Sequence, residues 1–150
     1  MNKHHYYMKM AIAAAQASKC LRAKYGTVIV SADGRIVSTG YNGKPRGSLN
    51  DTICYRLDMP RDAPKENCCL HSEANAIMFS TPLDRKGGTM YISGVPCNDC
   101  ALLIMQSGID AAFYLVDGHT YNGPDMCKKY GHHFLLHPIR KEELDEEASS

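Results

Sequence analysis

The stretch His71-Ser72-Glu73-Ala74-Asn75-Ala76-Ile77 predicts the start of a helix that carries an imidazole and a carboxylate two residues apart. Further along, Pro96-Cys97-Asn98-Asp99-Cys100 predicts a second helix start, because proline is favoured in the first turn of a helix. Its two thiols are three residues apart and would point the same way, and the helix dipole would favour their thiolate forms. The fold therefore has to bring two helix starts together.

The two helix starts supply the donor set of a catalytic zinc site. Catalytic zinc keeps three protein ligands and leaves a fourth position to water, whereas structural zinc is usually closed by four Cys or His ligands. We predict His71, Cys97 and Cys100 as the ligands of one catalytic Zn²⁺ per chain. His-x-Glu followed by Pro-Cys-x-x-Cys is the signature of zinc-dependent deaminases, whose glutamate is the general acid and base. Glu73 occupies that position.

Two simpler interpretations compete with the catalytic one. His71 and Glu73 could be ordinary residues of a helix start, or the two segments could form a closed structural zinc knot. A knot requires a fourth Cys or His ligand, and the first segment offers a glutamate instead. Because four positions agree in type, order and spacing, the catalytic interpretation is favoured.

The bulk composition favours one domain that acts on a small molecule. The chain has 150 residues, 44% hydrophobic residues and a net charge of +1, which is not the basic balance of a protein that holds a long phosphate backbone. The opening residues 1–7 lack the apolar region of a signal peptide, and no apolar run is long enough to span a membrane. Seven cysteines without a secretory signal indicate a reducing compartment, so we predict a cytoplasmic protein.

Hydrophobic patterning predicts alternating helices and strands. The predicted helices are 4–18, 71–80, 97–107 and 121–130, and the predicted strands are 27–30, 35–41, 89–93, 111–116 and 133–136. This order predicts a three-layer α/β/α sandwich around a mixed five-stranded sheet with an antiparallel first pair and a parallel remainder. We expect Ala74, Ile77 and Met78 to face the core. Residues 1–140 would form one domain, and the acidic tail 141–150 would fray.

Residues 42–70 separate the hairpin from the first zinc segment without any clear periodicity. This stretch contains three prolines and three cysteines. Loops of this length inside a small domain are usually functional or disordered. Because it leads directly into His71, we interpret it as a binding or regulatory insertion.

Three segments give the chain a resemblance to the deoxycytidylate (dCMP) deaminases, which convert dCMP to dUMP. They are Gly40-Tyr41-Asn42-Gly43-Lys44-Pro45-Arg46-Gly47, the stretch 71–77, and Pro96-Cys97-Asn98-Asp99-Cys100 with the following Gln106-Ser107-Gly108-Ile109. The resemblance covers about residues 5–137, and Ser72 stands where the family usually has alanine. It implies a cytidine deaminase-like fold and a supply of dUMP for dTMP synthesis.

The resemblance also implies roles for residues outside the zinc segments. Asn42 would bind the sugar, the backbone near Val95 would accept a hydrogen bond from the departing amino group, and Tyr121 would help to hold the phosphate. Members of the family are often hexamers that dCTP activates and dTTP inhibits, and Mg²⁺ would accompany such a triphosphate. The expected effector site includes Gly43, Lys44 and Arg46. Read without the resemblance, these residues could equally be a turn, solvated charges and a packed aromatic side chain.

The remaining cysteines could be ligands of a second metal ion. Some viral members of the family carry a structural zinc, and Cys20 and Cys54 with Cys68 or Cys69 could form one, helped by a histidine such as His4 or His5. We favour ordinary thiols at these positions and at Cys127.

Three other functions stay open at this stage. A tRNA adenosine deaminase of the same fold would need basic and aromatic surface, and the chain has no Trp, three Phe and a near-neutral charge. A second candidate acts on dCTP as well as dCMP. The third is a zinc-stabilised binding module without turnover, which would have no use for Glu73. The sequence therefore favours a free deoxynucleotide as substrate, with no nucleic-acid or membrane partner.

Overall fold

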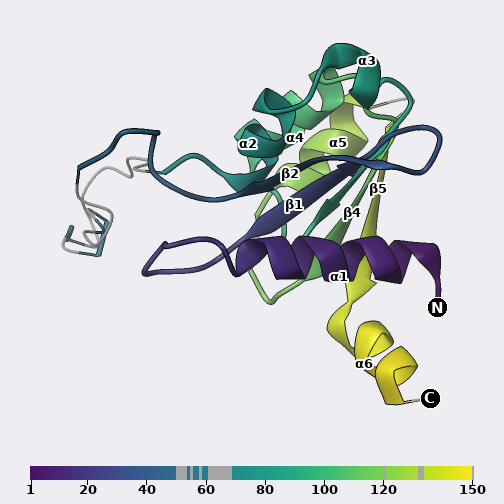
Figure 1. Cartoon of the computed structure of the whole chain (residues 1–150), viewed down its shortest axis with the longest axis horizontal. Coiled ribbons are helices and arrows are strands. Elements are labelled where there is room, and N and C mark those ends of the chain that lie inside the picture. The colour runs from purple at the N-terminus through teal and green to yellow at the C-terminus, as the bar shows by residue number, and fades with distance from the viewer. Residues whose placement is uncertain are drawn as a thin grey trace.

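A mixed five-stranded sheet lies between two layers of helices, as the sequence predicts (Figure 1). The computed structural model describes residues 1–49, 54, 56, 57, 59, 60, 69–119, 121–131 and 134–149. The helices are α1 (Lys3–Ala15), α2 (Ser72–Met78), α3 (Pro82–Arg85), α4 (Asn98–Gln106), α5 (Gly123–Tyr130) and α6 (Lys141–Ser149). The strands are β1 (Gly26–Val30), β2 (Ile36–Tyr41), β3 (Thr89–Ile92), β4 (Ala111–Val116) and β5 (Leu135–Arg140).

The strand order β2-β1-β3-β4-β5 decides where a site can form. β1 is antiparallel to both β2 and β3, while β3, β4 and β5 run parallel to one another. This confirms the predicted antiparallel first pair and parallel remainder. The carboxyl ends of β3 and β4 therefore meet at one edge of the sheet, where ligands of open α/β sheets usually bind.

Alternating side chains along the strands build one core on each face of the sheet. Val28, Val30 and Tyr91 belong to the cluster that packs against α1, together with Met8 and Ala11. The intervening strand residues belong to the second cluster, which contains Ile29, Met90, Ile92, Ala76 and Ile104. Figure 1 shows α1 along one face of the sheet, with α2 and α4 on the other. Both zinc segments thus begin helices of the same layer.

Gly40 allows α2 to lie directly against β2. A Cβ atom at this position would lie 2.4 Å from the carbonyl oxygen of Ser72 and 2.5 Å from the backbone nitrogen of Ala76. Any other residue would therefore push the first turns of α2 away from the sheet. This close approach sets the position of the helix start that carries His71 and Glu73.

One prediction about packing is wrong. Met78 is 64% exposed instead of facing the core, because the buried positions of α2 are Ser72, Glu73 and Ala76. The acidic segment after residue 140 forms α6, and Leu144 of this helix is buried in the cluster that packs against α1. None of the helices in the described part of the chain is long and apolar enough to cross a bilayer.

Candidate active site

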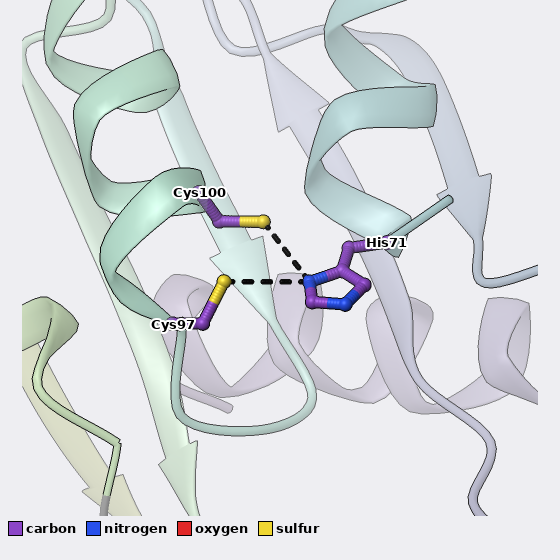
Figure 2. A group of neighbouring side chains, drawn as sticks. All are labelled: His71, Cys97 and Cys100. Carbon is purple, nitrogen blue, oxygen red and sulfur yellow. Dashed lines mark hydrogen bonds between the residues drawn. The ribbon is translucent and has the colours of Figure 1, made fainter. Parts of the chain in front are cut away.

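His71, Cys97 and Cys100 converge from the starts of α2 and α4 (Figure 2). The His71 Nδ1 atom lies 3.4 Å from Cys97 Sγ and 3.3 Å from Cys100 Sγ. A tetrahedral zinc ion with bonds of about 2.0–2.3 Å separates nitrogen and sulfur ligands by about 3.5 Å. The spacing and the chemistry of these donors therefore fit zinc.

The N-cap side chains of α2 and α4 are both available to bind a metal ion. His71 and Cys97 are the N-cap residues of α2 and α4, a position where side chains often bond to the helix backbone. In this part of the structure, which is fully described, neither side chain makes such a capping bond. The geometry thus favours metal ligation over the interpretation of His71 as a simple helix cap.

Mutual contacts among the three donors shift their pKa values. The pKa of Cys97 is lowered to about 4, first because the Cys100 thiol donates a hydrogen bond to it and further by contact with His71. The same hydrogen bond and burial raise the pKa of Cys100, and the contact with Cys97 raises the pKa of His71. Metal ligands must be deprotonated, so zinc binding would displace these protons.

Glu73 lies beside the three donors without joining them. Its side chain is only 5% exposed and lines the cavity next to the donors, and its charge contributes to the raised pKa of Cys100. Among the described residues, the group of converging metal donors contains only His71, Cys97 and Cys100. A site with three ligands and a neighbouring carboxylate has the layout of catalytic zinc and not that of a closed knot.

One cavity brings the predicted substrate residues to the donor group. Asn42, Val95 and Tyr121 all line it, together with His71 and Glu73. Asn42, Val95 and Tyr121 come from the end of β2, the loop after β3 and the loop after β4, respectively. They meet because these three strand ends lie at the same edge of the sheet. The predicted contacts with sugar, amino group and phosphate remain predictions.

Asn42 also has a clear structural task. It is 7% exposed, and its Oδ1 accepts a hydrogen bond of 2.8 Å from the backbone N–H of Tyr25. Its Nδ2 donates to the carbonyl oxygen of Ala23 at 2.9 Å. The side chain therefore holds the turn between α1 and β1 against the cavity, and any contact with a sugar would add to this role.

Three further cavity residues were missed by the sequence reasoning. Arg22, Arg56 and Tyr25 line the same cavity as the donor group. Burial, reinforced by Asp117, raises the pKa of Tyr25 to about 12, so this phenol remains neutral. The basic composition of residues 19–26 was the available signal for Arg22. Nothing in the sequence singled out Arg56 within the insertion.

A second cavity adjoins the first and contains the predicted effector residues. Gly43, Lys44 and Arg46 line it together with Lys19. The wall residues that belong to both cavities are Cys20, Asn42, Cys54 and Cys69. The guanidinium of Arg46 also lies over the Phe79 ring, 5.7 Å from its centroid. The loop after β2 thus contributes to both cavities.

The described cysteines outside the donor group do not assemble a second metal site. Cys20, Cys54 and Cys69 line the cavity walls, and Cys68 lies outside the described residues. His4, one proposed helper, contacts Tyr91 on the α1 face, with its Nδ1 2.7 Å from the phenol oxygen. Within the described part of the chain, His71, Cys97 and Cys100 are the only group of side chains placed to bind a metal ion.

Residues 1–116 match the family model for the cytidine and deoxycytidylate deaminase zinc-binding region. The chain belongs to this family. It is 39% identical to human deoxycytidylate deaminase over 114 residues, which cover 75% of this chain and 64% of the relative. It is 38% identical over 119 residues to the deoxycytidylate deaminase of Mycobacterium phage D29, covering 73% of this chain and 91% of that protein. The matched region thus spans less than two thirds of the human relative.

A solved structure agrees with the family assignment. The dCMP deaminase of cyanophage S-TIM5, determined with dCMP and dUMP, aligns with a TM-score of 0.71. It is 28% identical, and the alignment covers 89% of this chain and 94% of that one. The predicted cytidine deaminase-like fold is therefore confirmed.

Proposed function

We propose that the protein is a zinc-dependent enzyme that hydrolyses dCMP to dUMP and ammonia. The observation that carries the proposal is the buried Glu73 carboxylate beside three zinc-type donors, in a cavity that also holds two arginines. Membership of the deaminase family and similarity to deoxycytidylate deaminases support the same reaction. Supply of dUMP for dTMP synthesis in the cytoplasm belongs to this proposal.

Glu73 would move the protons of the reaction. Zinc, when bound, supplies a Lewis acid that lowers the pKa of a water molecule to about 7. The Glu73 carboxylate would take one proton from the attacking water and deliver it to the ring nitrogen, and would then pass the second proton, from the newly added hydroxyl group, to the amino group, which leaves as ammonia. The backbone at Val95, which lines the cavity, would accept a hydrogen bond from the amino group before it leaves. The reaction consumes one water molecule and releases one ammonia molecule for each dCMP.

The two arginines support a phosphorylated substrate. Arg22 and Arg56 line the cavity, with Tyr25 and Tyr121 as further hydrogen-bonding groups. Guanidinium groups bind phosphate through paired, charge-assisted hydrogen bonds, so this wall suits a nucleotide better than a nucleoside. Two arginines do not by themselves distinguish a monophosphate from a triphosphate, which is why dCTP remains the second candidate substrate.

Ammonia release from a panel of substrates tests the proposal. Purified zinc-loaded protein is assayed with dCMP, dCTP, deoxycytidine, cytidine and a tRNA stem-loop. The proposal predicts the highest kcat/KM for dCMP. A preference for the stem-loop would indicate a nucleic-acid deaminase, and no release from any substrate would favour a zinc-stabilised binding module.

Regulation by dCTP and dTTP is the finer part of the proposal. The second cavity carries Lys19, Lys44 and Arg46, whose charges suit a triphosphate with Mg²⁺. Gly43 forms an isolated bridge with Leu70, in which each N–H donates to the carbonyl oxygen of the other, at 3.1 and 2.7 Å. Because Leu70 precedes His71, a ligand that moves the loop after β2 would act directly on the zinc segment.

Initial rates against dCMP concentration test this regulation. Activation by dCTP and inhibition by dTTP are expected to shift the midpoint of the curve in opposite directions. Repeating the titration without Mg²⁺ would weaken both effects if the metal accompanies the triphosphate. Identical hyperbolic curves under all conditions would dismiss the regulatory part and leave the deaminase proposal intact.

Exposed apolar side chains support a homo-oligomer, with a hexamer favoured by the resemblance. They lie on α2, α3, α4 and the turn after α2, and they are Met78, Phe79, Leu83, Leu102 and Leu103, between 42% and 82% exposed. Exposed apolar surface of this kind commonly marks an interface. Sedimentation of Phe79→Ser should show a smaller particle than the wild type. Met10→Gln, on the α1 layer, is the matched control and should sediment like the wild type.

A further inference from the structure

Two buried hydroxyl groups connect the centre of the sheet to the Glu73 carboxylate. The Oγ1 atom of Thr27, on β1, lies 2.8 Å from Ser72 Oγ. The Ser72 hydroxyl donates to Glu73 Oε1, also at 2.8 Å. Thr27 and Ser72 are both 0% exposed. The three side chains therefore form a short chain of hydrogen bonds whose two hydroxyl groups are buried.

The direction of this chain follows from the number of hydrogens. A serine hydroxyl has a single proton to donate, and Ser72 gives it to the Glu73 carboxylate. The contact between Thr27 and Ser72 then requires the Thr27 hydroxyl to be the donor. Both hydroxyls thus point their protons toward the negative charge, and buried hydrogen bonds of this kind strengthen one another.

We propose that Ser72 and Thr27 are positioning residues for Glu73. The bond from Ser72 holds Oε1 and so sets the orientation of a carboxylate that lines the cavity beside the zinc donors. Thr27 in turn holds the Ser72 hydroxyl in the rotamer that makes this bond. The inference rests on the proposed function.

Ser38 offers a matched control for a purely structural role. It is also a buried serine, and its hydroxyl donates to the carbonyl oxygen of Ala76, on the same helix as Ser72, at 2.7 Å. Its hydrogen bond therefore joins the sheet to α2 without touching Glu73. If buried hydroxyls only stabilise the packing of α2, loss of Ser38 and loss of Ser72 should have similar consequences.

The experiment compares Ser72→Ala, Thr27→Val, the double variant and Ser38→Ala. For Ser72→Ala we expect kcat for dCMP to fall about tenfold, equivalent to about 1.4 kcal/mol of activation free energy, with little change in KM or zinc content. Thr27→Val should lower kcat about threefold on its own and add almost nothing to Ser72→Ala, because it acts through the same bond. Thr27→Ser keeps the hydroxyl and should recover most of the loss.

The controls separate positioning from stability. Ser38→Ala should lower Tm about as much as Ser72→Ala while its kcat stays within about twofold of the wild type. An equal fall in kcat for both serine variants, or wild-type kcat in Ser72→Ala, would overturn the proposal. If the wild type does not deaminate dCMP, the proposed function fails separately, and the same ratios are measured with the substrate that the panel identifies.

A crystal structure of zinc-loaded Ser72→Ala provides a readout that does not depend on turnover. The proposal predicts a Glu73 carboxylate that is rotated or split between two orientations, with the zinc donors unchanged. A carboxylate in the wild-type orientation would contradict it, even in a variant that is slow for another reason.

Discussion

The helix starts and the loops around the cavity differ in how they hold their functional groups. His71, Cys97 and Glu73 stand at or next to the first residue of helices packed on the sheet, and Gly40 brings one of these helices against β2. Lys44 and Arg46 instead come from the loop that follows β2. Packed elements suit chemistry that needs fixed geometry, whereas loops suit recognition that changes between relatives. The reaction is therefore expected to depend on the helix starts, and the choice of ligand on the loops.

Loss of a zinc ligand should have the largest effect. Cys97→Ala removes one of three donors, so bound zinc and deamination should both fall below detection. At a zinc concentration about a thousand times the Kd of the wild type, the free energy of unfolding of the variant should be about 4 kcal/mol lower than that of the wild type, because the variant gains no stability from bound zinc. Metal analysis and thermal unfolding check this. Cys127→Ala, which removes a buried thiol on α5, should retain zinc, and loss of zinc there would undermine the assignment.

Glu73→Gln should come next, because it removes the proton carrier and keeps the ligands. We expect kcat to fall by about three orders of magnitude while zinc content is unchanged. Stopped assays of dUMP formation with parallel metal analysis test this. Retention of activity in this variant would contradict the assignment of Glu73 as general acid and base.

On the recognition side, Arg22→Ala should impair substrate binding more than turnover. Loss of a charge-assisted bond to phosphate should lower kcat/KM for dCMP about 10- to 100-fold, mainly through KM. Deoxycytidine, which has no phosphate, should be affected little by the change. Arg35→Ala removes an exposed arginine on the hairpin and serves as the control. An equal loss with both substrates would show that Arg22 acts on the fold and not on phosphate.

The smallest effect is expected in the second cavity. The double variant Lys44→Ala/Arg46→Ala should weaken the response to dCTP about tenfold, measured as the concentration that gives half of the maximal activation. A rate titration against dCTP at fixed dCMP checks this. An unchanged response would show that dCTP does not act through Lys44 and Arg46, and it would contradict a regulatory role for the loop after β2.

The sequence predicts the helix starts better than the loops for a physical reason. Zinc ligation demands particular residue types at particular spacings, so His71, Cys97 and Cys100 can be found from local patterns, and strand periodicity predicts the sheet. Arg22 and Arg56 reach the cavity only after distant segments fold together. The contact between Thr27 and Ser72 likewise needs the packing of α2 on β1. Burial of Leu144 depends on a single apolar residue in an acidic tail, which no periodicity reveals.

The central claim, hydrolysis at the helix-start site, is tested most directly by isotope labelling. Zinc-loaded protein is incubated with dCMP in water enriched in oxygen-18, and the product is analysed by mass spectrometry. The account predicts dUMP with one labelled oxygen at the carbon that lost its amino group, and one ammonia for each dUMP. Unlabelled dUMP, or no dUMP from zinc-loaded protein, would contradict it.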